Sequence, residues 1–211
     1  SSANCAAVAP FCGPNTAAAP WGPSKGLVTS QATIRRTPSK RWAAGLRSRL
    51  WSFASPWPPG GISSPCSSSN RAPSACNRQP YHFLVIDDGQ LLDELMALPI
   101  GTKGFAHNVP CSIVVTADLS YFPTEKDRHL IYIDSALATM QLMLAFETLG
   151  LSSCPINWPD IELYEKQMDK ALSLEKHQRP IMLMAVGYGK KEGGIPFSQK
   201  KSAEQLIKEI D

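Results

Sequence analysis

A polar loop, Arg71-Ala72-Pro73-Ser74-Ala75-Cys76-Asn77-Arg78-Gln79-Pro80-Tyr81, leads directly into the apolar run His82-Phe83-Leu84-Val85-Ile86. Its small residues allow the backbone to come close to a ligand, and the side chains of Ser74, Asn77 and Gln79 offer hydrogen-bond donors and acceptors. Pro73 and Pro80 restrict the backbone where the loop begins and ends. A short polar loop beside a buried strand is a common place to bind a flat cofactor.

Charge divides the chain of 211 residues into two parts, although its length suits a single α/β domain. Residues 1–70 carry 7 Lys and Arg and no acidic residue, whereas residues 71–211 carry 14 basic and 18 acidic residues. The first part also holds nine Pro and thirteen Ser and shows no helical or strand periodicity. We therefore divide the chain into an atypical segment, 1–70, and a folded domain, 71–211.

Three interpretations of residues 1–70 stay open. A Ser- and Arg-rich segment without acidic residues is typical of an organelle transit peptide. It is also compatible with a disordered basic tail that binds an anionic partner. The third interpretation is that this part of the sequence is misassigned, for example read out of frame, because the composition changes abruptly at the start of the polar loop.

The second part alternates between predicted strands and helices. Apolar, β-branched runs predict buried strands at 81–86, 111–117 and 180–189, the last of them central. Helical spacing predicts helices at 90–98, 131–149, 160–170 and 202–210, and residues 101–108 and 151–158 are expected to be loops. The third helix should turn Ile161, Leu163, Tyr164 and Met168 inward, and the last should dock through Leu206, Ile207 and Ile210. The helix at 131–149 is apolar on most sides, which is typical of a domain centre or a dimer interface, and Gly150 should cap its end. This alternation indicates an α/β or α+β fold.

Several functions find no support in the sequence. The six cysteines include no CxxC pair, so we expect no metal site. Cys76, Cys111 and Cys154 lie among apolar or small residues, which is typical of reduced thiols in a cytoplasmic protein. There is no run of eighteen apolar residues and no phosphate-binding glycine motif, so we expect neither membrane insertion nor a dinucleotide fold. The four histidines are scattered, and no acid–base pair or nucleophile stands out, so no catalytic side chain is assigned.

The loop at 71–81 resembles the flavin-binding "APSxxNxQPW" signature of the nitroreductase family of FMN-dependent oxidoreductases. Three later segments resemble motifs of that family and follow in the same order. They are the helix from Asp134 to Glu147 with Leu149-Gly150-Leu151, the strand end Val186-Gly187-Tyr188-Gly189, and the tail Ile195-Pro196-Phe197-Ser198-Gln199-Lys200-Lys201. Together the resemblance covers residues 71–205.

The resemblance implies an α+β fold, a three-layer α/β/α arrangement with a central mixed sheet flanked by helices, in an interlocked homodimer with FMN at the subunit interface. It implies an enzyme that takes hydride from NADH or NADPH and reduces nitroaromatics, quinones or a related small-molecule electron acceptor by a ping-pong mechanism. The flavin N5 carries the hydride, so the protein needs no acid–base pair of its own. We accordingly expect a cytoplasmic protein that binds neither nucleic acid nor a membrane.

The resemblance also implies roles for individual residues. Ser74 and Asn77 would bind the flavin ring or ribityl chain with support from Gln79, and Pro155 and Ile156 would lie against one face of the flavin. The backbone N–H of Asn157 would point at N5. The candidates for holding the phosphate are Lys200, Lys201, Arg35 and Arg36. Arg35-Arg36-Thr37 begins like the family's "RRSxRxF" motif, but Pro38 breaks the spacing, and Lys200 replaces an Arg and so lacks its bidentate fork.

Two alternatives to this function stay open. The protein could be a flavin-binding dimer without turnover, because its phosphate-binding residues depart from the family pattern. It could also be a family member that carries out reductive dehalogenation or flavin breakdown.

Overall fold

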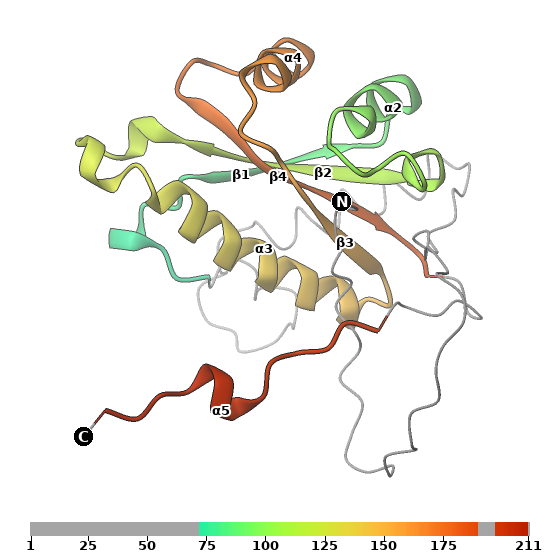
Figure 1. Cartoon of the computed structure of the whole chain (residues 1–211). Coiled ribbons are helices and arrows are strands. Elements are labelled where there is room, and N and C mark those ends of the chain that lie inside the picture. The colour runs from blue at the N-terminus through green and yellow to red at the C-terminus, as the bar shows by residue number, and fades with distance from the viewer. Residues whose placement is uncertain (1–71, 190–196, 211) are drawn as a thin grey trace, which may run out of the picture.

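The computed structural model describes residues 72–189 and 197–210 and is built around a four-stranded sheet (Figure 1). The strands are β1 (Tyr81–Ile86), β2 (Cys111–Asp118), β3 (Ser152–Asn157) and β4 (Gln178–Gly187), in the order β1-β2-β4-β3. All three pairings are antiparallel. The expectation of a mixed sheet is therefore wrong for the described strands: β2 and β3 run in the same direction, but β4 lies between them and pairs antiparallel with both.

Helices cover both faces of the sheet. Figure 1 shows α2 (Gly89–Ala97) and α4 (Glu162–Leu172) on one face and the long helix α3 (Leu130–Thr148) on the other. These bounds agree with the predicted helices to within about two residues. The α+β class and the α/β/α layering implied by the resemblance are thus confirmed.

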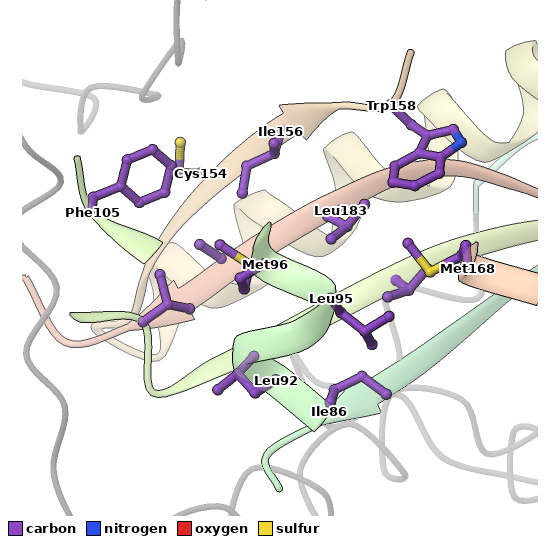
Figure 2. Packing of buried hydrophobic residues seen from close by; sticks show 13 residues of the cluster. Ile86, Leu92, Leu95, Met96, Phe105, Cys154, Ile156, Trp158, Met168 and Leu183 are labelled. Atoms are coloured by element: carbon purple, nitrogen blue, oxygen red, sulfur yellow. The ribbon is translucent and has the colours of Figure 1, made fainter. Parts of the chain in front are cut away.

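The core has two layers because side chains alternate across the sheet. Every residue of β2 is buried: Val114 packs with the α2 and α4 side, and Ile113 with the α3 side. Figure 2 shows the first layer, where Leu95 of α2 and Met168 of α4 meet Leu183 of β4. A strand buried on both faces reads as a continuous apolar run, which is why β2 and β4 could be predicted from the sequence.

Helix α3 ends where the sequence predicts. Gly150 has φ +69°, and the N–H groups of Gly150 and Leu151 donate to the carbonyls of Glu147 and Phe146. Among the described residues, the stretch Glu125–Thr148 is the one helix that is long and apolar enough to cross a membrane. Half of its most apolar part is buried within the fold.

The apolar residues of α3 divide between two sides. Those that face the sheet include Ile131, Leu142 and Phe146, which are almost fully buried. A second set forms a stripe on the opposite side, which we call the α3 outer stripe. Its members are 43–48% exposed: Ile133, Leu137, Met140 and Leu144. Four large apolar side chains at helical spacing on an exposed face indicate an interaction surface.

Three expectations are wrong in detail. Residues 152–157 form strand β3 rather than a loop; the run Ser-Ser-Cys-Pro has low strand propensity, and an edge position tolerates its proline. Ile161 and Leu163, expected to face inward with Met168, are exposed. Cys154 is disulfide-bonded rather than reduced.

The C-terminal tail is less helical than predicted. Helix α5 spans only Ala203–Leu206, and the segment that carries it runs away from the sheet (Figure 1). Leu206, Ile207 and Ile210, predicted to dock, are 66–94% exposed. They therefore do not dock on the described part of their own chain.

Candidate cofactor-binding site

The polar loop before β1 adopts a strained backbone. It contains a short 3-10 helix, Ala75–Asn77, and three of its residues have positive φ: Cys76 (51°), Asn77 (53°) and Gln79 (48°). Left-handed conformations cost L-residues free energy, although Asn tolerates them best. Such strain persists only where surrounding contacts impose it, and it concentrates at functional sites.

Hydrogen bonds within the loop close it into a compact unit. The N–H of Asn77 donates to the Ser74 carbonyl at 2.9 Å, and the N–H of Arg78 donates to the Ala75 carbonyl at 3.1 Å. The N–H of Gln79 donates to the Ser74 hydroxyl at 2.7 Å. These three N–H groups are used inside the loop and are therefore not available to a ligand.

The side chains offered to a ligand are two amides. Gln79 Nε2 donates to Asn77 Oδ1 at 3.0 Å, and Asn77 is exposed. The neighbouring Arg78 is turned to the protein: its guanidinium donates to the Tyr121 carbonyl at 2.6 Å and lies over the Phe122 ring. The loop therefore presents a paired Asn–Gln surface with free donors and acceptors.

Asp134 of α3 is a site residue that the sequence-based assignment missed. Its side chain is buried, with 2% exposure, and its Oδ2 accepts from the Ser74 hydroxyl at 2.7 Å and from the Ala75 N–H at 3.1 Å. Helical spacing alone could have indicated a buried carboxylate, because Asp134 falls on the buried side of α3 between Ile131 and Ala138. Its partner Ser74 lies 60 residues earlier, which no local pattern reveals.

Tyr81 adjoins this carboxylate at the start of β1. Its hydroxyl is buried and has no hydrogen-bond partner among the described residues. Burial raises the pKa of the Tyr81 hydroxyl above its ordinary value, and the negative charge of Asp134 raises it further. The neutral phenol is thus the form that the fold favours.

The second group of candidates lies on β3. Ile156 is 6% exposed, and its side chain points into the core layer shared with α2 and α4 (Figure 2). Pro155 pairs with Met184 and Asn157 with Met182, so both lie on the α3 face. Because neighbours in a strand point to opposite sides, the side chains of Pro155 and Ile156 lie on different faces of the sheet.

The remaining candidates lie apart from these two groups. Lys200 and Lys201 are exposed in the tail that carries α5. Arg35 and Arg36 lie outside the described residues. Within the described part of the chain, no group of three or more His, Cys, Asp or Glu is placed to hold a metal ion.

The loop and β3 lie at opposite edges of the sheet. The loop precedes β1, and Asn157 ends β3, so three strand spacings separate them, about 14 Å. Both nevertheless belong to the α3 side, because the loop contacts Asp134 of α3 and Asn157 is level with Met182 on that face. The candidate residues on the loop and those on β3 thus form two separate groups.

Comparison with known proteins identifies the family. The model of the Nitroreductase family matches residues 97–188. The chain is 31% identical over 124 residues to "Putative NADH dehydrogenase/NAD(P)H nitroreductase" of Archaeoglobus fulgidus, covering 57% of this chain and 68% of that protein. It is 27% identical over 137 residues to "Iodotyrosine deiodinase" of Thermotoga neapolitana, covering 57% and 72%.

Solved structures agree with the fold. An FMN-dependent nitroreductase from Clostridium difficile aligns with a TM-score of 0.62 at 18% identity, over 85% of this chain and 92% of its own. A nitroreductase-like structure from Desulfovibrio desulfuricans, solved in complex with FMN, aligns with a TM-score of 0.59 at 21% identity, over 87% and 94%. The chain has the nitroreductase fold, and by the family match and its relatives it belongs to the nitroreductase family.

Proposed function

We propose that the protein is an FMN-dependent oxidoreductase that takes hydride from NADH or NADPH and passes it to a nitroaromatic, a quinone or a related acceptor by a ping-pong mechanism. The observation that carries this proposal is the strained, internally closed loop that presents the Asn77–Gln79 amide pair. The names of the family relatives support the nicotinamide donor, and the FMN-bound neighbour supports the cofactor.

The loop fits a flavin in its chemistry. The edge of a flavin ring alternates carbonyl oxygens and nitrogens, and a side-chain amide carries both a donor and an acceptor. Asn77 would bind this edge, Gln79 would hold the Asn77 amide in orientation, and Asn157 would direct its backbone N–H at N5. When bound, FMN supplies the hydride-carrying N5, so the chain's own task is to bind and orient.

We propose that two copies of the chain complete each site. A flavin ring whose edge meets Asn77 would not also place its N5 beside Asn157 of the same copy, because the loop and β3 lie at opposite edges of the sheet. Packing the α3 outer stripes of two copies together would bury the stripe and could bring the loop of one copy toward β3 of the other. This supports a homodimer with a flavin at the interface.

The charges for the cofactor phosphate would come from the tail. Lys200 and Lys201 are exposed, and a point charge suits a phosphate even without a bidentate fork. Arg35 and Arg36 stay candidates for the same role.

The visible spectrum of the purified protein tests the proposal. We expect flavin absorption bands, present as purified or after addition of FMN, that bleach when NADH or NADPH is added without oxygen. Reoxidation by a nitroaromatic or a quinone would then identify the acceptor class. A protein that stays colourless after reconstitution with FMN would contradict the proposal, and bound flavin that neither donor bleaches would favour a dimer without turnover.

Reductive dehalogenation is a second candidate, supported by the similarity to the iodotyrosine deiodinase of Thermotoga neapolitana. Halide release from an iodophenol by the reduced protein would favour it over nitro reduction. Reduction of nitroaromatics without halide release would exclude it.

A further inference from the structure

Asp134 is a buried carboxylate whose hydrogen-bond partners come from one loop. Its Oδ2 accepts from the Ser74 hydroxyl and the Ala75 N–H, and no basic residue in the described ranges forms an ion pair with it. A buried charge is costly unless hydrogen bonds satisfy it. The carboxylate and the loop therefore depend on each other.

The charge of Asp134 also fixes the direction of the hydrogen bonds. An ionised carboxylate only accepts, so the single proton of the Ser74 hydroxyl must point at Asp134. A lone pair of the same oxygen is then aimed at the Gln79 N–H, 2.7 Å away. The result is a chain of three groups, from Asp134 through Ser74 to Gln79.

This chain holds the strained end of the loop. Gln79 has φ +48°, and its side chain orients the Asn77 amide at 3.0 Å. Without Asp134 the Ser74 hydroxyl would be free to rotate, and Gln79 would lose a contact that holds its left-handed backbone. The Ser74 proton is also committed, so Ser74 has none to donate to a cofactor.

We propose that Asp134 is a positioning residue for cofactor binding, which acts through the Ser74 hydroxyl on Gln79 and so presets the Asn77–Gln79 amide pair that meets FMN. This inference rests on the proposed function. It also reassigns Ser74, which the family resemblance places on the flavin, to the support of the loop.

A double-mutant cycle tests the hydrogen-bonded chain from Asp134 through Ser74 to Gln79. FMN affinity is measured by quenching of FMN fluorescence by the FMN-free protein, for the wild type, Ser74→Ala, Asp134→Asn and the double variant. Each single variant should weaken binding about tenfold, the effect of one charge-assisted hydrogen bond. The double variant should be no more than about tenfold weaker, because both changes break the same chain. Ser74→Thr, which keeps the hydroxyl, should restore wild-type affinity.

Asp118→Asn is the matched control. Asp118 is also a buried carboxylate that contacts a serine, through the Ser120 N–H at 2.7 Å and the Ser120 hydroxyl at 2.6 Å, and it lies 3.4 Å from His177 Nε2. It meets the loop through its backbone N–H, which donates to the Pro80 carbonyl and is kept in the variant. This variant should lower the melting temperature and leave FMN affinity unchanged. A general loss of stability would weaken binding in both aspartate variants alike and would contradict a positioning role.

Other outcomes separate this inference from the proposed function. Single variants within twofold of the wild type, or a double variant about a hundredfold weaker, would overturn the positioning role while FMN binding stands. Should the wild type not bind FMN, the proposed function fails, and with it the cofactor part of the inference. Hydrogen exchange of the Gln79 backbone N–H in the FMN-free protein then tests the loop directly. Faster exchange in Asp134→Asn and Ser74→Ala supports the hydrogen-bonded chain from Asp134 to Gln79, and unchanged exchange overturns it.

Discussion

Gln79 Nε2 donates a hydrogen bond of 3.0 Å to Asn77 Oδ1, so the two amides of the loop are oriented as a pair. The bond uses one acceptor of Asn77 and leaves its NH₂ group for a ligand. The pair is therefore the part of the loop where a change of side chain should be felt most directly by a bound cofactor.

We expect Asn77→Ala to weaken FMN binding by about 1–3 kcal/mol, the cost of leaving polar partners unmet. Part of that loss could come from the backbone, because Asn77 has φ +53° and Ala is strained there. Asn77→Gly is the matched variant, since it removes the amide and relieves the strain. Titration should show weak binding in both; wild-type affinity in the glycine variant would assign the effect to the backbone and contradict the role of the amide.

The α3 outer stripe should hold two copies together. Burying a large aliphatic side chain contributes about 1.5–3 kcal/mol, so a charge at Leu137 should weaken self-association by a hundredfold or more. Sedimentation should show a dimer for the wild type and a monomer for Leu137→Asp, with FMN affinity lost in parallel. Leu163→Asp, at a 62% exposed position on α4, should remain dimeric. A monomeric wild type would contradict the dimer and the shared site.

Much of this fold could be predicted because apolar runs and helical spacing are local signals. Strands β1, β2 and β4 and helix α3 are apolar enough to be recognised alone. Edge strand β3 could not, because only its pairing with β4 makes Ser152–Asn157 extended. The site shows the same limit: the loop residues were visible in the sequence, whereas the contact between Ser74 and Asp134 depends on tertiary packing.

Tyr81 should make stability fall in alkaline solution. Burial and then the charge of Asp134 raise its pKa, so the folded state keeps the proton longer than the unfolded state. This contribution is fully present below the unfolded pKa of about 10 and is lost as pH rises through the folded pKa. Tyr81→Phe removes the unpartnered hydroxyl and keeps the ring contact with Phe83. Urea unfolding should show this variant losing less stability above pH ~10 than the wild type; parallel losses would exclude Tyr81 as the cause.

Asp169 near the end of α4 should destabilise the fold at neutral pH. Its Oδ1 is buried without a hydrogen-bond partner among the described residues, and burial raises its pKa despite the opposing effect of Arg179. A negative charge at a helix C-terminus is also unfavourable. The raised pKa means that the penalty is absent below the unfolded pKa of about 4 and appears as pH rises through the folded pKa. Asp169→Asn should therefore raise the melting temperature at pH 7 and leave it unchanged in acid.

Glu162, at the other end of the same helix, provides the control with the opposite sign. A hydrogen bond from Lys166 and the charge of Lys166 lower the pKa of Glu162. Its contribution is present above the unfolded pKa and is lost as pH falls through the folded pKa. Glu162→Gln should thus lower the melting temperature slightly at pH 7, where Asp169→Asn raises it. Shifts of the same sign in both variants would show that the general charge of the protein, rather than position along α4, decides the effect.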